Sequence, residues 1–231
     1  MNKIKCQVAS IEALTPNVYK VLLKPEQSVS FVAGQYLNFV LNADDKRPFS
    51  IASSPNNELI ELQIGAFVAD SYPMQVIEHV KNNNEVTVEL PLGNAELRTE
   101  STKPLLLIAG GTGFSYIKSM FEYLSQQKSS RKVIVYWGLR EPSACYELEK
   151  SAEIIAQLPQ SEFHPVVETP NDGWSGKVGM VHQVVMNDID NLEDFDIYLA
   201  GRFDMVGIIR DDFIARGVSK DSMFGDAFAY I

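Results

Sequence analysis

The sequence predicts two folding units, a small antiparallel β-barrel followed by a doubly wound parallel α/β sheet. Three observations support this prediction. The first hundred residues hold six short β segments, strand and helix alternate after Pro104, and an apolar run there leads into Gly110-Gly111-Thr112-Gly113. A chain of 231 residues is long enough for two ordinary domains. We expect them to span residues 1–100 and 101–231, divided near the polar residues 98–103.

The barrel strands are predicted from alternating apolar and polar residues bounded by turn residues. They cover residues 5–11, 18–23, 36–41, 49–52, 59–64 and 86–90. One helix interrupts them at residues 71–80, with Met74, Ile77 and Val80 at helical spacing. Short strands in this number are typical of a small barrel or sandwich.

The second unit is predicted from a change of periodicity. Residues 105–109 form a continuous apolar run, as in a parallel strand that is covered on both faces. The side chains of Phe114, Ile117, Phe121 and Leu124 then repeat at helical spacing. Further strands are predicted at 133–137, 163–167, 196–200 and 223–224, and further helices at 147–158, 178–185 and 205–214. This alternation is typical of a doubly wound parallel sheet.

The composition favours a globular protein of the cytoplasm. The chain is 45% hydrophobic and 22% charged, no apolar run approaches the roughly eighteen residues of a membrane helix, and the N-terminus lacks the apolar core of a signal peptide. A net charge of −10 disfavours nucleic acid and anionic membranes as partners. Cys6 and Cys145 form no C-x-x-C pair and the histidines are scattered, so we assign no metal site and no iron–sulfur cluster.

The segment Arg47-Pro48-Phe49-Ser50 is the first candidate site. It brings a fixed positive charge, an aromatic ring and a hydroxyl together at the end of a β-rich segment. That set suits a flat, polar, redox-active ring such as a flavin. Taken alone it also suits an ordinary strand, so its interpretation depends on the second unit.

The segment Gly110-Gly111-Thr112-Gly113 is the second candidate site, a phosphate-binding loop. In doubly wound sheets ligands bind beyond the carboxyl ends of the strands, where a helix N-terminus offers unpaired N–H groups and partial positive charge. Glycines allow the backbone to approach a pyrophosphate closely, and the Thr112 hydroxyl is a further donor. The loop has neither the G-x-G-x-x-G spacing nor a Walker A ending. A glycine-rich turn without a ligand is the alternative.

Two later strands end with a glycine and an arginine. They lead into Gly138-Leu139-Arg140 and Gly201-Arg202-Phe203. An arginine at the carboxyl end of a strand suits the recognition of phosphate or ribose, whereas a solvated surface charge is the alternative for each.

The combination of a barrel carrying Arg-x-aromatic-Ser and an α/β unit opening with Gly-Gly-Thr-Gly resembles the ferredoxin–NADP reductase superfamily. The chain is most similar to its NAD(P)H:flavin oxidoreductase branch, which includes the general bacterial flavin reductases and the reductase associated with bacterial luciferase. The likeness extends over essentially the whole chain. It rests on KRPFSIASS (46–54), LIAGGTGFSY (107–116), residues 136–138, AGRF (200–203) and FGDAFAYI (224–231).

The resemblance implies hydride transfer from NADH or NADPH to the N5 atom of a flavin. Ser50 would be the catalytic residue beside N5, the pyrophosphate of the nicotinamide nucleotide would bind at the glycine loop, and Phe228 or Tyr230 would lie near the nicotinamide. The implied cofactor-binding residues are Arg47, Pro48, Phe49, Ser50, Gly65, Gly110, Gly111, Thr112, Gly113, Phe114, Arg140, Gly201, Arg202 and Phe203.

Two departures from the superfamily pattern are informative. Members that hold FAD permanently carry Gly-x-x-Ser where the barrel helix begins. In the stretch Gly65 to Ser71 that motif is absent, and we expect Asp70 to cap the helix and repel a phosphate. We therefore expect FMN, FAD or riboflavin to be a substrate that comes and goes. Ala200 stands where many members place a cysteine, so hydride transfer would depend on positioning.

Two other functions are compatible with the sequence. One is a tightly flavinated reductase component that passes electrons to a protein partner, and the other is a non-catalytic nucleotide-binding module. The sequence leaves open the choice between NADH and NADPH. It also leaves open whether luciferase, a monooxygenase or iron release uses the reduced flavin, and we expect a monomer.

Overall fold

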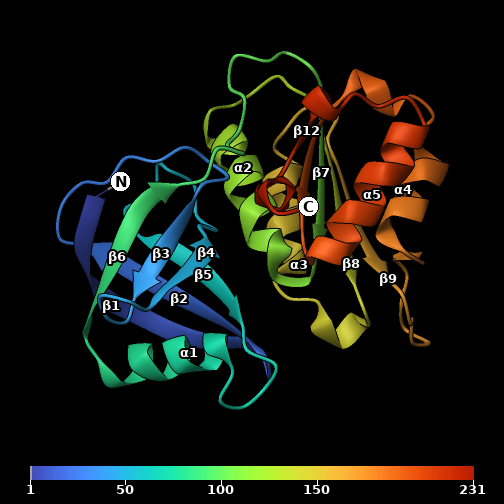
Figure 1. The fold of residues 1–231 in the computed structure, drawn as a ribbon. Coiled ribbons are helices and arrows are strands. Elements are labelled where there is room, and N and C mark those ends of the chain that lie inside the picture. The colour runs from blue at the N-terminus through green and yellow to red at the C-terminus, as the bar shows by residue number, and fades with distance from the viewer. Residues whose placement is uncertain (1) are drawn as a thin grey trace.

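The computed structural model describes residues 2–231, which form two β-sheets that lie side by side (Figure 1). The first is a six-stranded antiparallel sheet in the order β4-β3-β6-β1-β2-β5. Its strands are β1 (Asn2–Thr15), β2 (Val18–Pro25), β3 (Tyr36–Val40), β4 (Lys46–Ser50), β5 (Ile60–Gly65) and β6 (Glu85–Leu92). The predicted antiparallel unit is therefore confirmed.

The two edges of this sheet meet just beyond β4. The backbone N–H of Ala52 donates to the carbonyl of Glu61 in β5 at 2.8 Å, which closes the sheet towards a barrel. The helix α1 (Tyr72–Asn82) connects β5 to β6 and packs Val76, Ile77 and Val80 into the barrel core. The predicted helix at 71–80 thus lies where it was expected.

Two barrel strands differ most from their predicted bounds, and the others differ by one or two residues at an end. β1 exceeds the predicted 5–11 because its first part pairs with β6 and its later part with β2. β4 was predicted at 49–52 but begins at Lys46, because Lys46 to Ser50 pair in register with Val40 to Tyr36 of β3. This shift places Ser50 at the end of the strand.

The second sheet is six-stranded and parallel, in the order β10-β9-β8-β7-β11-β12. Its strands are β7 (Leu105–Gly110), β8 (Val133–Leu139), β9 (Glu162–Val167), β10 (Lys177–Val178), β11 (Asp196–Ala200) and β12 (Met223–Phe224). The helices are α2 (Phe114–Gln126), α3 (Leu148–Ile155), α4 (Val181–Asp188) and α5 (Phe203–Ala215). The sequence predicted each of these elements except the two-residue β10.

Helices cover both faces of the parallel sheet, as the continuous apolar strands predicted (Figure 1). Leu105 and Leu107 of β7 pack in the core that contains residues of α2 and α3. Leu106 and Ile108, which point the other way, pack in the core that contains residues of α4 and α5. The sheet is therefore doubly wound.

The helix α2 also packs against the barrel through buried polar groups. The Lys118 ammonium lies 3.2 Å from the Glu61 carboxylate of β5 and 3.3 Å from Glu122. The Ser119 hydroxyl donates to the carbonyl of Ser53 at 2.7 Å. Burial alone would lower the pKa of Lys118, but the nearby carboxylates raise it, so the ammonium stays charged. These contacts hold the two sheets in one arrangement.

Within residues 2–231 we find no helix that combines the length and apolar character needed to cross a membrane.

Candidate active site

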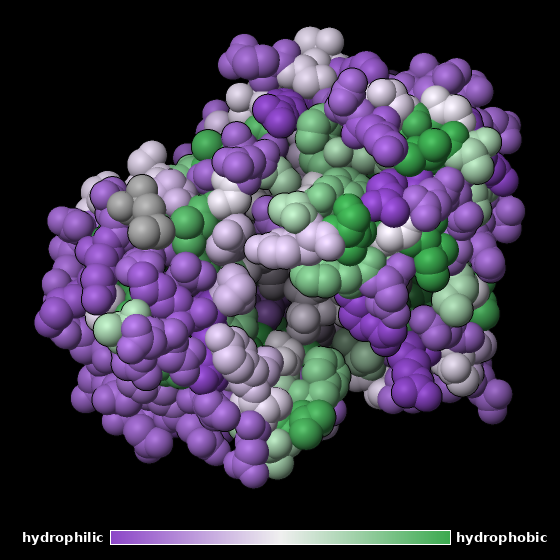
Figure 2. Space-filling view, viewed as in Figure 1, coloured by the Kyte–Doolittle hydropathy of each residue, from purple (hydrophilic) through white to green (hydrophobic). Residues whose placement is uncertain are grey.

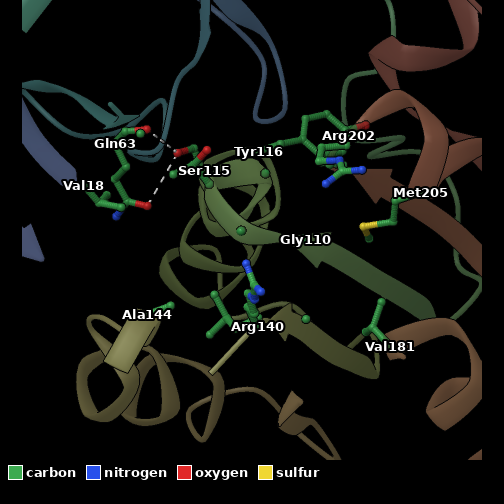
Figure 3. A pocket seen from close by; sticks show the side chains of 18 of the residues that line it. Val18, Gln63, Gly110, Ser115, Tyr116, Arg140, Ala144, Val181, Arg202 and Met205 are labelled. Atoms are coloured by element: carbon green, nitrogen blue, oxygen red, sulfur yellow. Dashed lines mark hydrogen bonds between the residues drawn. The ribbon is translucent and has the colours of Figure 1, made fainter. Parts of the chain in front are cut away.

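A cleft of about 1260 Å³ separates the two sheets, and both sheets contribute to its walls (Figures 2 and 3). Pockets for one drug-sized ligand usually measure about 300–1,000 Å³. This cleft exceeds that range, so it has room for two ligands side by side.

The barrel wall of the cleft contains Pro48, Phe49 and Ser50 from β4. Ser50 is the last residue of β4, pairs with Tyr36 of β3 and is half-buried. Among the hydrogen bonds of residues 2–231, none involves the Ser50 hydroxyl. The hydroxyl is therefore free to bond a ligand.

Arg47 does not reach this cleft, in contrast to the expectation that it lies along the flavin. Its side chain is 4% exposed and bonds the Asp45 carboxylate at 2.6 and 2.8 Å and the Gln75 side chain at 2.8 Å. Successive residues of a strand point to opposite faces, so Arg47 cannot share the direction of Pro48. The guanidinium also lies over the Tyr72 ring, and its charge is already balanced by Asp45.

The start of α1 differs from the prediction as well. Ser71, not Asp70, caps the helix, because the Ser71 hydroxyl accepts from the N–H of Met74 at 3.4 Å. Asp70 precedes the cap in a left-handed conformation with a φ of 58°. Pro73 occupies the first turn and has no N–H, so few free donors remain at this end of α1.

The opposite wall is the glycine loop between β7 and α2, as predicted. Gly110, Gly111, Thr112 and Gly113 all border the cleft. Gly111 has a φ of +53° and faces open space, so it exposes backbone to any ligand there. Gly113 is needed for another reason, because a Cβ at this position would lie 2.6 Å from the carbonyl oxygen of Ala200. The backbone of the loop therefore packs closely against the carboxyl end of β11.

Phe114 is a core residue and its side chain does not reach the cleft. The ring is fully buried and stacks on Trp137 with a centroid separation of 4.0 Å. Trp137 in turn donates its ring N–H to the carbonyl of Gly111 at 2.9 Å, which fixes the loop. The stacked rings of Phe114 and Trp137 therefore pack behind the glycine loop and hold its backbone in place.

The two strand-end arginines border the cleft, as do Gly201 and Phe203. Arg140 is exposed and follows β8. Arg202 follows β11 and bonds the carboxylate of Asp204, through its Nε at 3.1 Å. Phe203 stacks on Tyr230 at a centroid separation of 5.4 Å, which brings the C-terminal aromatic segment to the rim.

Several cleft residues were not predicted. Gln63, Ser115, Tyr146 and Asp226 all border the cleft, although none was singled out as a site residue. Burial and the nearby Glu96 raise the pKa of Asp226 to about 6. Ser115 and Asp226 lie within the segments 107–116 and 224–231, and Gln63 lies two residues before Gly65, so these three had a sequence signal.

The antiparallel barrel, the doubly wound sheet and the glycine loop on their shared cleft are the arrangement expected of a nucleotide-dependent oxidoreductase. The family described as "Oxidoreductase NAD-binding domain" matches residues 107–211, which include the loop. Among solved structures, the ferredoxin reductase in carbazole 1,9a-dioxygenase aligns with a TM-score of 0.85 and 25% identity, over 98% of this chain and 69% of that one.

Comparison with curated protein sequences identifies the family within this class of oxidoreductases. The chain is 43% identical to the NAD(P)H-flavin reductase of Vibrio harveyi over 99% of both chains. It is also 43% identical to the NAD(P)H-flavin reductase of Aliivibrio fischeri, again over 99% of both. The chain belongs to the NAD(P)H-flavin reductase family.

Proposed function

We propose that this protein transfers hydride from C4 of NADH or NADPH to N5 of a flavin and then releases the reduced flavin. The observation that carries this proposal is the two-walled cleft, with the free Ser50 hydroxyl on one wall and the glycine loop on the other. Stacking the two rings at about 3–3.5 Å removes several kcal/mol of barrier by orientation alone. The rings supply the redox chemistry, and the chain supplies position and hydrogen bonds.

In this proposal the barrel, residues 1–100, binds the flavin ring beside Pro48, Phe49 and Ser50. The α/β unit, residues 101–231, binds the nicotinamide nucleotide, with its pyrophosphate at residues 110–113. Arg140 and Arg202 would contact its phosphate or ribose groups. The family membership and the shared cleft support this division of roles.

We further propose that the flavin is a substrate, because the chain offers little to hold its phosphate end. The charge of Arg47 is balanced by Asp45, and the Met74 N–H at the start of α1 is taken by Ser71. Asp70 adds a carboxylate nearby in sequence, although it is not the cap. Recognition then rests on the ring and ribityl chain, which suffice for micromolar binding of roughly 8 kcal/mol.

This proposal is tested by following the near-ultraviolet absorbance of NADH and NADPH with FMN, FAD or riboflavin as acceptor. We expect rapid oxidation, with similar KM values for riboflavin and FMN. Absence of oxidation with every flavin would instead indicate a non-catalytic nucleotide-binding module.

The alternative is a tightly flavinated component that reduces a protein partner. The structural likeness to a ferredoxin reductase supports this alternative function. Gel filtration separates the two, because a transient flavin leaves the protein colourless whereas a prosthetic flavin leaves it stoichiometrically yellow.

We propose that the protein acts as a monomer in the cytoplasm, apart from nucleic acid and membranes. Its reduced flavin would then diffuse to an acceptor such as luciferase or a monooxygenase. Addition of purified luciferase, an aldehyde and FMN tests the first acceptor by light emission.

A further inference from the structure

Three buried polar residues, Gln63, Ser115 and Tyr146, are not used by the reaction as described above. All three residues border the cleft, and each is at least nine-tenths buried. Gln63 comes from β5, Ser115 from the first turn of α2, and Tyr146 from the segment before α3. Figure 3 shows Gln63 and Ser115 facing each other across the junction of the two sheets.

Two carboxylates fix the orientation of the Gln63 amide. Its Nε2 donates to Glu61 at 2.9 Å and to Glu147 at 2.8 Å. A carboxylate accepts hydrogen bonds and repels an amide oxygen, so the nitrogen must face both carboxylates. The Oε1 atom is therefore held on the other side.

The carboxylates are themselves held in place. Glu147 is bonded by Lys20 at 3.1 Å and Glu61 by Lys118 at 3.2 Å. Burial alone would raise the pKa of Glu147, but Lys118 and the hydrogen bond from Lys20 lower it below its usual value. The carboxylate thus stays ionised and keeps accepting from Gln63.

The Oε1 atom retains capacity to accept a hydrogen bond. The neighbouring Ser115 hydroxyl lies 3.5 Å from it, at the long limit for a hydrogen bond. The Tyr146 hydroxyl is buried and has no hydrogen-bond partner within the described chain. Because the contact with Ser115 is long, Gln63 Oε1 can accept a shorter hydrogen bond from a ligand that presents an N–H.

Gln63 is also close to the reacting position. The Ala52 N–H donates to the carbonyl of Glu61 at 2.8 Å, so the segment that follows Ser50 lies beside β5. Ser50 and Gln63 are each two residues from this hydrogen bond, and both border the cleft. A group that donates to Gln63 Oε1 therefore belongs to one of the rings beside Ser50.

We infer that Gln63 is a specificity-determining residue whose Oε1 accepts a hydrogen bond from the amide N–H of a reacting ring. This inference rests on the proposed function. The amide is either the imide N3–H of the flavin or the carboxamide of the nicotinamide, since both present N–H beside C=O near the reacting atoms.

The test compares kcat/KM for natural substrates and analogues that lack the N–H. 3-Methylriboflavin removes it from the flavin, and reduced 3-acetylpyridine adenine dinucleotide removes it from the nicotinamide. We expect the wild type to use one analogue about fivefold to tenfold less well than its parent. Gln63→Met keeps the length of the side chain but removes its oxygen. This variant should have equal kcat/KM for the parent substrate and for the analogue that the wild type uses less well. The analogue that the wild type uses less well shows whether Gln63 bonds the flavin or the nicotinamide.

Gln126→Met is the matched control. Gln126 also bridges the two sheets, through Ser54 at 2.6 Å and Asn57 at 2.8 Å, but it does not border the cleft. Gln126→Met should keep the wild-type ratio of kcat/KM between the parent substrate and its analogue. Should Gln63→Met not fold, Glu147→Ala serves in its place, because it removes one of the two carboxylates that hold the Gln63 nitrogen and should weaken the discrimination severalfold.

Equal use of parent and analogue by the wild type, or unchanged discrimination in the variant, would overturn the inference. That result leaves the proposed function intact as long as the wild type oxidises NADH with riboflavin. Failure of that reaction itself would refute the proposed function.

Discussion

Gly65 of β5 packs directly against Thr112 of the glycine loop, so that a Cβ on Gly65 would lie 3.0 Å from the Thr112 Cγ2. This contact joins the barrel to the loop at the cleft. The φ of Gly65 is not in the left-handed region, so its requirement for glycine is steric. The contact sets how closely the loop approaches the barrel wall.

Gly65→Ala should therefore disturb the site more than the fold. The added methyl would lie 2.8 Å from the exposed Phe67 ring and 3.0 Å from Thr112, so both side chains must move, and small misplacements of the loop lower rates steeply. We expect kcat/KM for NADH to fall about threefold to tenfold with little change in the thermal midpoint. Gly173→Ala is the control, because its Cβ would meet only Asn171 at 3.9 Å. Identical kinetics for both variants would show that the contact has no role.

Ser50→Ala should retain the fold and lose activity. The hydroxyl has no protein partner to lose, whereas a bond to flavin N5 in the transition state is worth roughly 1–3 kcal/mol, a loss of about tenfold or more. Steady-state kinetics with FMN and riboflavin measure the effect. Ser125→Ala, on α2 and outside the cleft, is the comparison. Unchanged turnover of Ser50→Ala would remove this residue from the mechanism.

Asp226 should make stability depend on pH. Burial and Glu96 raise its pKa from 3.8 to about 6, so the native state binds a proton that the unfolded chain has released. The free energy of unfolding therefore falls as pH rises between about pH 4 and pH 6. Asp226→Asn lacks this titration. The free energy of unfolding of the variant minus that of the wild type should therefore be larger above about pH 6 than near pH 4. Urea denaturation at both values tests this, and a pH-independent difference contradicts it.

Lys118→Met should strongly destabilise the protein. It leaves the buried carboxylate of Glu61 without its cation, a loss that typically costs about 3–5 kcal/mol. Lys132→Met removes an exposed pair with Glu162 and should cost at most about 1 kcal/mol. Comparable urea midpoints for the two variants would show that the buried pair does not hold the sheets together.

The features predicted from the sequence depend on local signals. The glycine loop was found because an apolar strand, glycines and a helix follow one another directly. Ser50 was found because it lies beside an aromatic residue at a strand end. In both cases the residues that form the feature are adjacent along the chain.

The features that were missed depend on contacts between distant residues. Gln63 is oriented by Glu147, which lies 84 positions away. Arg47 was predicted to bind the flavin, but its guanidinium contacts Asp45 and α1 and lies outside the cleft. Phe114 was predicted to bind the cofactor, but its side chain is buried in the core, as its helical spacing with Ile117 already indicated. Which of Asp70 and Ser71 caps α1 depends on a backbone conformation that the sequence does not specify.

The central claim is that flavin is consumed as a substrate. Its most direct test is an anaerobic mixture of a trace of enzyme, excess NADH and FMN in large excess over the enzyme, observed through the visible absorbance of the flavin. We predict that the absorbance of the entire FMN pool is lost, with one NADH oxidised per FMN. Loss limited to one equivalent of flavin per protein chain, or no loss, would contradict the claim.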